Sequence, residues 1–193
     1  MSDPAGPDNP GGVVISNVEE DTTYYGAEPL SPYEMPDVTL TATNEEPFNL
    51  IQDTGYPVTI VYFGYTYCPD VCLLVMSDLT SALAQLPPDV RKRTQLLYIT
   101  TDPARDTPDV LRSYLDRYDE DYVGLTGSLH DIVTAADSLG VAIEGRRRLP
   151  SGGYEVGHGA QVIGFEGDLA PVLWTQGTPV ADMVADITKL ASS

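Results

Sequence analysis

The sequence predicts an α/β sandwich, in which helices pack on a largely parallel β-sheet. Two short apolar runs at residues 58–64 and 94–100 are rich in β-branched and aromatic side chains, as expected of strands buried on both faces. A segment with apolar residues at helical spacing follows each run. Two further apolar runs flank Gly167 near the end of the chain and predict an antiparallel hairpin. Parallel strands joined by crossover helices, with an antiparallel edge, give this class of fold.

The remaining elements follow from local signals in chain order. Residues 37–40 and 48–51 can pair as a short leading hairpin. Thr107 is typical of a helix N-cap, Pro108 of a first helical position, and Gly140 of the residue that ends a helix. Helices are predicted over residues 71–86, 108–118, 128–139 and 179–190, and the late hairpin over residues 160–165 and 170–174. This order is compatible with a thioredoxin-like fold that carries a leading β-hairpin and inserted hairpin and helix elements.

The composition restricts the function. The chain has 193 residues, 42% of them hydrophobic, which suits one globular domain with a sizeable core and a tail. With 29 acidic against 10 basic residues the formal net charge is −19, which disfavours nucleic acids and anionic membrane surfaces as partners. No apolar run approaches the roughly 20 residues of a membrane-spanning helix. Two cysteines and two histidines exclude a multi-site zinc protein, an iron–sulfur protein and a disulfide-rich mini-domain.

The acidic charge is concentrated near the start of the chain. Residues 1–56 hold 11 Asp and Glu and no Lys or Arg, and residues 1–12 are mostly Pro, Gly, Asp, Asn and Ser. Such a segment buries too little apolar surface to offset the entropy of ordering it. We therefore expect residues 1–30 to form a flexible acidic arm and residues 31–193 to form the domain. The arm is either a disordered terminus or a tether that follows a membrane anchor, and the sequence favours neither.

The cysteines lie together in the segment 64–72, GYTYCPDVC, which holds Cys68 and Cys72. It follows the first core strand and opens the first long helix, where ligands of α/β sheets bind and helix N–H groups favour thiolate over thiol. Residues i and i+4 of a helix have Cβ atoms about 5–6 Å apart, against about 3.8 Å in a disulfide. Two thiolates on one metal ion stand on the order of 4 Å apart. The C-x-x-x-C spacing therefore suits a shared metal ion at least as well as a disulfide, and a purely structural pair stays open.

Two histidines are available as a further ligand. His158 lies between Gly157 and Gly159, just before a predicted strand, and the glycines leave room around the imidazole and freedom in the backbone. His130 is expected in the first turn of a surface helix, as a solvated or capping residue. Two thiolates and an imidazole form a soft donor set that selects Cu(I), and imidazole suits copper in either oxidation state. Because structural zinc takes four ligands and His130 is an unconvincing fourth, this set favours copper over zinc.

A second polar segment is expected at the same edge of the sheet. Residues 100–108, TTDPARDTP, follow the second core strand, whose carboxyl end lies beside that of the first. Asp102 or Asp106 is predicted either to orient a metal ligand by contacting it without binding the metal, or to meet a charge on a partner. Plain helix capping with an Arg105 ion pair is the alternative. The run RRR at 146–148 is expected at a solvated hairpin edge, with contact to a partner as the lesser alternative.

Together the two polar segments resemble the signature of the Sco/SenC family of copper proteins. The similarity includes residues 62–72, YFGYTYCPDVC, residues 101–108, TDPARDTP, and the GLTG sequence at 124–127. His158, which precedes a hydrophobic strand, stands where that family has its metal-binding histidine. The resemblance extends over nearly all of the predicted domain.

The resemblance implies a thioredoxin-like fold and one copper ion, Cu(I) or Cu(II), bound by Cys68, Cys72 and His158. It further implies an extracytoplasmic protein, tethered by an N-terminal membrane segment, that assists assembly of the dinuclear copper site of cytochrome c oxidase. Two positions depart from the family, since Leu73 replaces a common Pro and Tyr67 replaces the His of several members. Neither change removes a ligand, but Leu73 leaves the sulfur geometry open.

Three functions follow from these residues, and the sequence leaves the choice open. In the first, the chain is a copper chaperone for the copper-site subunit of the oxidase, with another copper chaperone or a thiol reductant as a further partner. In the second, which makes it an enzyme, Cys68 attacks a disulfide of that subunit and Cys72 resolves the mixed disulfide. In the third, the cysteine pair is structural and His158 is incidental. From the resemblance we expect the first function, with the second as the alternative; the sequence holds no evident general acid–base pair, nucleophile triad or phosphate loop.

Overall fold

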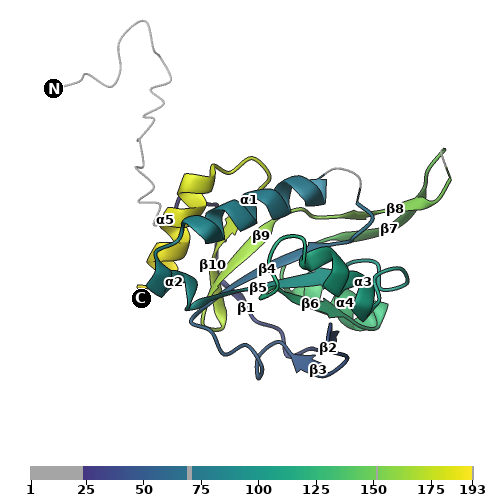
Figure 1. Cartoon of the computed structure of the whole chain (residues 1–193), viewed down its shortest axis with the longest axis horizontal. Coiled ribbons are helices and arrows are strands. Elements are labelled where there is room, and N and C mark those ends of the chain that lie inside the picture. Colours follow the sequence, from purple (N-terminus) through teal and green to yellow (C-terminus); the bar gives the residue numbers. More distant parts are fainter. Residues whose placement is uncertain (1–23, 69–70, 151, 193) are drawn as a thin grey trace, which may run out of the picture.

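A mixed eight-stranded sheet forms the centre of the computed structural model, which describes residues 24–68, 71–150 and 152–192. The strands are β1 (Tyr33–Glu34), β2 (Thr39–Ala42), β3 (Pro47–Asn49), β4 (Val58–Gly64), β5 (Thr94–Thr100), β6 (Val123–Thr126), β7 (Ile143–Arg148), β8 (Tyr154–His158), β9 (Val162–Glu166) and β10 (Leu169–Trp174). The helices are α1 (Val71–Gln85), α2 (Pro88–Arg91), α3 (Pro108–Leu115), α4 (Leu129–Ser138) and α5 (Val180–Leu190). The sheet order is β1-β10-β9-β4-β5-β6-β2-β3, and β7 and β8 form a separate two-stranded sheet (Figure 1).

The parallel centre of the sheet confirms the two predicted core strands. All residues of β4 and β5 are buried, and their parallel register pairs Val58 with Thr94 and Gly64 with Thr100. β-branched and aromatic side chains fit such a doubly covered, pleated surface. The late hairpin is confirmed as well, because β9 pairs antiparallel with both β10 and β4. Gly167 turns this hairpin at a φ of 56°, a conformation that glycine adopts readily.

Each face of the sheet carries its own hydrophobic core. Ile60, Tyr62 and Tyr98 point to the face that α1, α3 and α5 cover, whereas Val61 and Leu97 point to the face that α4 covers. Alternation along the strands produces this division. The buried side of α1 repeats at helical spacing and consists of Cys72, Val75, Met76, Leu79, Ala82 and Leu83. The side chain of Cys72 is therefore directed into the first core by the same periodicity that packs the helix.

Local signals fixed several boundaries correctly. The Thr107 side chain accepts a hydrogen bond from the Val110 amide and caps α3, as predicted. Gly140 follows the end of α4 with a φ of 66°. The leading hairpin is present as β2 and β3, shifted from the expected residues by up to two positions. The α3 helix ends at Leu115, three residues before the predicted end at Tyr118.

Three elements were not predicted: β1, α2 and β6. β6 is short and contains Gly124, so it carries little of the alternation that identifies a strand. It nevertheless joins the parallel core strand β5 to the antiparallel strand β2. The β7–β8 hairpin projects from the body beside the beginning of α1 (Figure 1), and the 146–148 arginine run lies on it as expected.

The folded part of the chain begins earlier than the expected boundary at residue 30. Tyr24 is buried, and Ala27 forms a β-bridge with Leu173. The buried Asp186 carboxylate accepts hydrogen bonds from the Tyr25 and Gly26 amides, both at 2.9 Å. Residues 24–30 therefore belong to the domain, while the rest of the expected arm, residues 1–23, lies outside the described residues. None of the helices within the described ranges has the length and apolar character needed to cross a bilayer.

Candidate functional site

The carboxyl ends of β4 and β5 lie side by side, as the sequence predicts. The Thr101 amide donates to the carbonyl oxygen of Gly64 at 2.7 Å, which fixes the two chain exits next to each other. From β4 the chain enters a turn in which the Cys68 amide donates to the Tyr65 carbonyl at 3.2 Å. From β5 it enters the loop that holds Asp102 and Asp106. Both predicted polar segments therefore reach the same edge of the sheet.

The two cysteines occupy different positions relative to α1. Cys68 precedes the helix and is half-buried, whereas Cys72 lies in the first turn and is completely buried. The Cys72 amide donates a hydrogen bond to the Cys68 sulfur at 3.5 Å, so this sulfur serves the helix start as a capping acceptor does. No disulfide joins these two described residues. Since α1 begins at Val71, the separation expected of two residues on one helix does not apply to this pair.

The imidazole of His158 faces Cys72. Its Nε2 atom lies 3.7 Å from the Cys72 sulfur, and its Nδ1 atom lies 2.8 Å from the carbonyl oxygen of Gly159. Because a carbonyl only accepts, Nδ1 carries the proton in this contact, and the Nε2 lone pair is left to face the sulfur. The Tyr65 ring stands edge-on to the imidazole, with centroids 5.8 Å apart. The ring of His158 is thus held from two sides, with its Nε2 atom toward the cysteine.

An open hollow of about 340 Å³ lies beside Cys68 and His158, and the buried Cys72 is not part of its lining. It is lined by Tyr65, Cys68, Val71, Glu155, Val156, Gly157, His158 and Ala160. With metal–sulfur and metal–nitrogen bonds near 2.3 and 2.0 Å, two ligands of a trigonal site stand about 3.7 Å apart, which is the separation seen between Cys72 and His158. Within the described ranges, no three Cys, His, Asp or Glu side chains are so arranged that they hold a metal as they stand. Two of the three predicted ligand residues therefore lie close together, and Cys68 borders the hollow beside His158.

The Cys72 thiol is strongly protonated in this environment. Its contact with the Cys68 sulfur is the first cause that raises the pKa of Cys72, and burial is the second. The Tyr62 hydroxyl and the Tyr65 backbone act in the opposite direction and lower this pKa. Release of the Cys72 proton therefore needs a stabilising agent for the thiolate, such as a bound cation.

Asp106 organises the cysteine turn. Its carboxylate accepts hydrogen bonds from the Thr66 amide at 2.9 Å and from the Thr66 and Thr100 hydroxyls at 2.7 Å each. Burial is the main cause that raises the pKa of this fully buried carboxyl group. Through Thr66, Asp106 fixes the turn that leads into Cys68.

Asp102 organises the hairpin that carries the histidine. Its buried carboxylate forms an ion pair with Arg105 and accepts hydrogen bonds from Arg146 Nη2 at 3.1 Å and from the Tyr154 hydroxyl at 3.0 Å. Arg105 in turn donates to the Tyr154 carbonyl at 3.1 Å, and its guanidinium lies 3.8 Å from the centroid of the Tyr154 ring. The expected Arg105 ion pair is thus present, and Asp102 additionally binds β7 and β8 to the β5 loop.

The remaining predicted residues have plainer positions. His130 is exposed in the first turn of α4, as expected of a solvated histidine. Tyr67 and Leu73, which depart from the family pattern, are 61% and 44% exposed at the edge of the cysteine turn. The backbone freedom expected of the glycines around His158 is not used, because neither Gly157 nor Gly159 adopts a positive φ.

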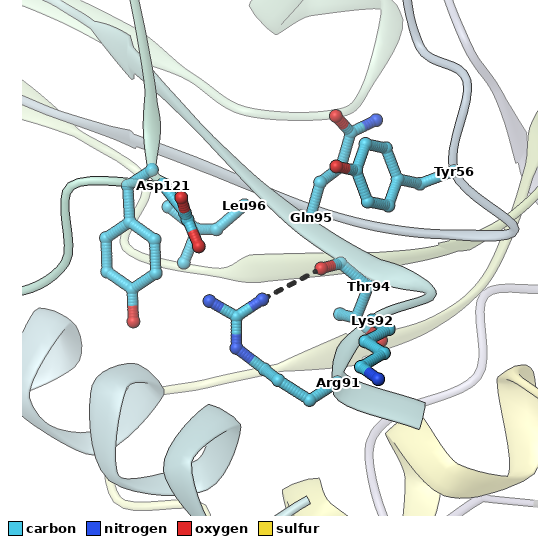
Figure 2. A pocket seen from close by; sticks show the side chains of 8 residues that line it. Tyr56, Arg91, Lys92, Thr94, Gln95, Leu96 and Asp121 are labelled. Carbon is cyan, nitrogen blue, oxygen red and sulfur yellow. Dashed lines mark hydrogen bonds between the residues drawn. The ribbon is translucent and has the colours of Figure 1, made fainter. Parts of the chain in front are cut away.

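A second hollow, of about 400 Å³, lies at the opposite end of β5 and contains none of the predicted ligands. It is lined by Tyr56, Arg91, Lys92, Thr94, Gln95, Leu96, Asp121 and Tyr122 (Figure 2). Arg91 donates to the Thr94 carbonyl at 3.2 Å and pairs with Asp119 at 3.0 Å. The Arg91 guanidinium is thus engaged within the domain. Because this hollow lies at the other end of β5, it has no evident role in the chemistry of the cysteines and His158.

Comparison with known proteins identifies the family. The SCO1/SenC family model matches residues 30–192, which include the cysteine turn, the Asp102 loop and the hairpin with His158. The chain belongs to the SCO1/SenC family. A relative named "Putative copper-binding protein" from Stutzerimonas stutzeri is 34% identical over 137 residues, which are 70% of this chain and 66% of that protein. The chain spans between 40% and 66% of the length of this protein and of two other curated relatives.

Solved structures of Sco proteins have the same fold as this SCO1/SenC domain. The apo Sco1 protein from Thermus thermophilus is 31% identical with a TM-score of 0.76, covering 87% of this chain and 97% of the other. A copper-bound structure of ScoI from Bradyrhizobium japonicum is 25% identical with a TM-score of 0.66, covering 86% and 98% of the two chains. These similarities confirm the predicted thioredoxin-like fold.

Sequence reasoning missed the contact that links Arg105 with Tyr154. Arg105 lies inside a segment already singled out, and its expected ion pair with an aspartate was the available signal. No periodicity in the sequence indicates that Tyr154 is its stacking partner.

Proposed function

We propose that this SCO1/SenC domain binds one copper ion through Cys68, Cys72 and His158. The observation that supports this most directly is the 3.7 Å contact between the Cys72 sulfur and the ligating nitrogen of His158, beside the half-buried Cys68. Thiolates and a neutral imidazole form a donor set that suits Cu(I), and the imidazole also accepts Cu(II). Cys68, which lines the hollow beside His158, supplies the third ligand.

The copper ion is cargo in this proposal and is passed to the copper-site subunit of cytochrome c oxidase. The resemblance to the Sco/SenC family supports this role, and the copper-binding relative and copper-bound neighbour support the choice of metal. Cys68 and His158 border an open hollow, so the ligands of a partner can approach there and replace those of the domain one after another. The same resemblance supports a site of action outside the cytoplasm with an N-terminal membrane tether.

Asp102 and Asp106 act in this proposal as positioning residues. Asp106 fixes the turn before Cys68 through Thr66, and Asp102 fixes the His158 hairpin through Tyr154 and Arg105. Neither carboxylate is itself a copper ligand. Their function is to bring the two sides of the site together from separate segments of the chain.

The decisive experiment is competition for Cu(I) between the reduced protein and a strong chelator. We expect a one-to-one complex with a sub-nanomolar Kd that is lost in the Cys68→Ser and Cys72→Ser variants and weakened at least tenfold in His158→Ala, the equivalent of about 1.4 kcal/mol. His130→Ala is the matched control, because it removes the other, exposed histidine. Equal affinities of the two histidine variants would show that the ligand assignment is wrong.

The alternative function is thiol–disulfide exchange with the same subunit. It is favoured by the half-buried Cys68, whose sulfur accepts a hydrogen bond from the Cys72 amide, and by the buried Cys72 next to it. The Cys68 thiolate attacks a partner disulfide and releases one partner thiolate; Cys72 then attacks the mixed disulfide, so that the partner is reduced to two thiols while a Cys68–Cys72 disulfide forms. Incubation of the subunit with copper-loaded or with reduced, copper-free protein separates the functions. The copper chaperone function predicts that the subunit gains copper absorption only after incubation with the loaded protein. Thiol–disulfide exchange predicts that the subunit gains free thiols without copper, and that this reaction does not depend on His158.

A further inference from the structure

Most of the basic residues of this acidic chain lie in two short runs, RKR at 91–93 and RRR at 146–148. The first run borders the second hollow, at the opposite end of β5 from the cysteines, and its Arg91 pairs with Asp119. The second run lies on β7, in the hairpin that carries His158. Positive charge is scarce in a chain with a formal net charge of −19, so its concentration beside the proposed copper site needs an explanation.

Two of the three arginines on β7 are presented to the surroundings. The Arg147 side chain is 77% exposed and pairs with Glu155. Arg148 is exposed and forms no ion pair with any residue in the described ranges. Arg146 differs from both, because it binds the buried Asp102 carboxylate. An exposed pair such as that of Arg147 contributes little to stability, so a carboxylate of another protein can compete for the guanidinium.

The same two arginines lie close to the hollow at which copper exchange is proposed. Glu155, the partner of Arg147, lines this hollow together with His158. On β8, the residues opposite Arg147 and Arg148 precede His158 by three and four positions. At about 3.3 Å per residue, these positions are about 10 and 13 Å from His158 along the strand. One side of a standard protein interface covers about 800 Å², a disc of about 16 Å radius, so a partner centred on the hollow reaches both arginines.

The hairpin is attached to the body in a way that fixes these charges relative to the site. Two guanidinium groups lie near the Tyr154 ring, with the central carbons of Arg105 and Arg146 at 3.8 and 4.7 Å from its centroid. Both groups also bind the Asp102 carboxylate. The arginine run therefore keeps its distance from the hollow, and little conformational entropy is lost when a partner binds there.

Protection of a free strand edge is the simpler explanation of the arginine run. Among the described strands, β7 and β8 pair only with each other, and charged residues on such edges prevent unwanted pairing. Acidic residues would serve this purpose equally well, and they dominate the rest of the chain. Arginine differs from them because its planar fork binds a carboxylate through two parallel hydrogen bonds. The choice of arginine therefore favours recognition of carboxylates.

We propose that Arg147 and Arg148 form a docking surface for a carboxylate-rich face of the protein that receives the copper ion. This inference rests on the proposed copper function. Most of the domain is acidic and repels such a face, so contact is favoured at the hairpin. A partner bound there has its own ligands beside the hollow that Cys68 and His158 line. The two arginines thus determine the orientation of the complex and take no part in holding copper.

The test uses the full chain and the soluble domain of the oxidase copper-site subunit from the same organism, reduced and copper-free. Calorimetric titration of the copper-free chain gives the Kd of the complex, and metal analysis of the rapidly separated proteins gives the rate of Cu(I) transfer from the loaded chain. We expect Arg147→Glu and Arg148→Glu each to weaken the complex and slow the transfer about fivefold or more, because each variant opposes carboxylates with a carboxylate. Arg148→Lys keeps the charge but not the fork and should lose about twofold.

Lys92→Glu is the matched control, because it makes the same change of charge in the other basic run. Its Kd and transfer rate should stay within about twofold of the wild type, since the charge lies outside the proposed interface and is screened by salt. The affinity of each variant for Cu(I) alone should equal that of the wild type. Substitution of lysine for an acidic residue beside the copper ligands of the subunit should restore part of the binding that Arg148→Glu loses.

Four outcomes would overturn the inference. Wild-type Kd and transfer rates in Arg147→Glu and Arg148→Glu would show that the hairpin does not meet the partner, and equal losses in Lys92→Glu would indicate an effect of net charge. Faster transfer in the reversed variants would indicate a basic partner face. A dimer of the free chain that dissociates in these variants would assign the surface to a second copy. Failure of the wild-type chain to bind Cu(I) would instead reject the proposed function, so the two failures are distinguishable.

Discussion

The Cys72 sulfur and the Nε2 atom of His158 lie 3.7 Å apart although 86 positions separate the two residues in the chain. Cys72 is fixed by α1, and His158 is the last residue of β8, where it pairs with Ile143 of β7. The β7–β8 sheet is separate from the main sheet, so hydrogen bonds between main-sheet strands do not position it. The placement of the imidazole therefore depends on the short link from His158 to β9 and on the side-chain contacts that attach this hairpin to the body.

Removal of the Asp102 carboxylate should loosen the hairpin. Asp102→Ala leaves Arg105, Arg146 and the Tyr154 hydroxyl without their shared acceptor. We expect amide hydrogen exchange over residues 143–158 to be about tenfold faster, with Cu(I) affinity between those of wild type and His158→Ala. The control is Arg147→Ala, which removes the pair between Arg147 and Glu155 at an exposed position. Unchanged exchange in Asp102→Ala would show that other contacts hold the hairpin.

Asp106 should contribute mainly to stability. Asp106→Ala removes the acceptor of the Thr66 amide and of the Thr66 and Thr100 hydroxyls, all of which are buried or half-buried. We expect the free energy of unfolding, measured with urea, to fall by about 2–4 kcal/mol. Asp137→Ala, an exposed aspartate on α4, should change it by less than about 0.5 kcal/mol. Similar values for both variants would contradict the buried role assigned to Asp106.

Copper affinity should rise with pH because Cys72 must release a proton. The pKa of Cys72 is raised above its ordinary value of 9.0, first by contact with Cys68 and then by burial, so the thiol is protonated at neutral pH. The protonated thiol favours the copper-free fold below pH 9.0, and this contribution is lost as pH rises through the raised pKa. Chelator competition between about pH 6 and 9 should give a Cu(I) affinity that rises with pH, with a slope that includes one proton from Cys72, and His130→Ala should keep the same slope. An affinity that does not change with pH would show that Cys72 binds no proton in the copper-free state.

The Asp186 carboxylate should hold the beginning of the folded chain in place. It accepts hydrogen bonds from the Tyr25 and Gly26 amides and from the Trp174 indole nitrogen. Asp186→Ala should lower the free energy of unfolding by about 2–4 kcal/mol and expose residues 24–30 to limited proteolysis. Asp168→Ala, at an exposed turn, is the control and should leave the cleavage pattern unchanged. Equal resistance to proteolysis in both variants would mean that the β-bridge of Ala27 alone retains the segment.

Local chemistry was sufficient to predict much of this molecule. The bounds of β4 and β5 follow from two apolar, β-branched runs, and the start of α3 follows from Thr107 and Pro108. The position of Cys68 and Cys72 at the start of a helix also follows from residues within one short segment. These features depend on interactions between near neighbours, which the order of residues specifies directly.

The tertiary structure alone decided which distant residues meet. Asp102 was expected to orient a metal ligand, to meet a charge on a partner or to pair with Arg105; it pairs with Arg105 and also attaches the hairpin that carries His158, because Tyr154 and Arg146 fold back onto the β5 loop. Strand β6 escaped prediction because its pairing with β5 and β2, rather than its own pattern, makes it a strand. The amino-acid sequence thus determined the reactive groups and the elements that carry them. Their mutual distance was decided by packing between segments far apart in the chain, for which local periodicity contains no information.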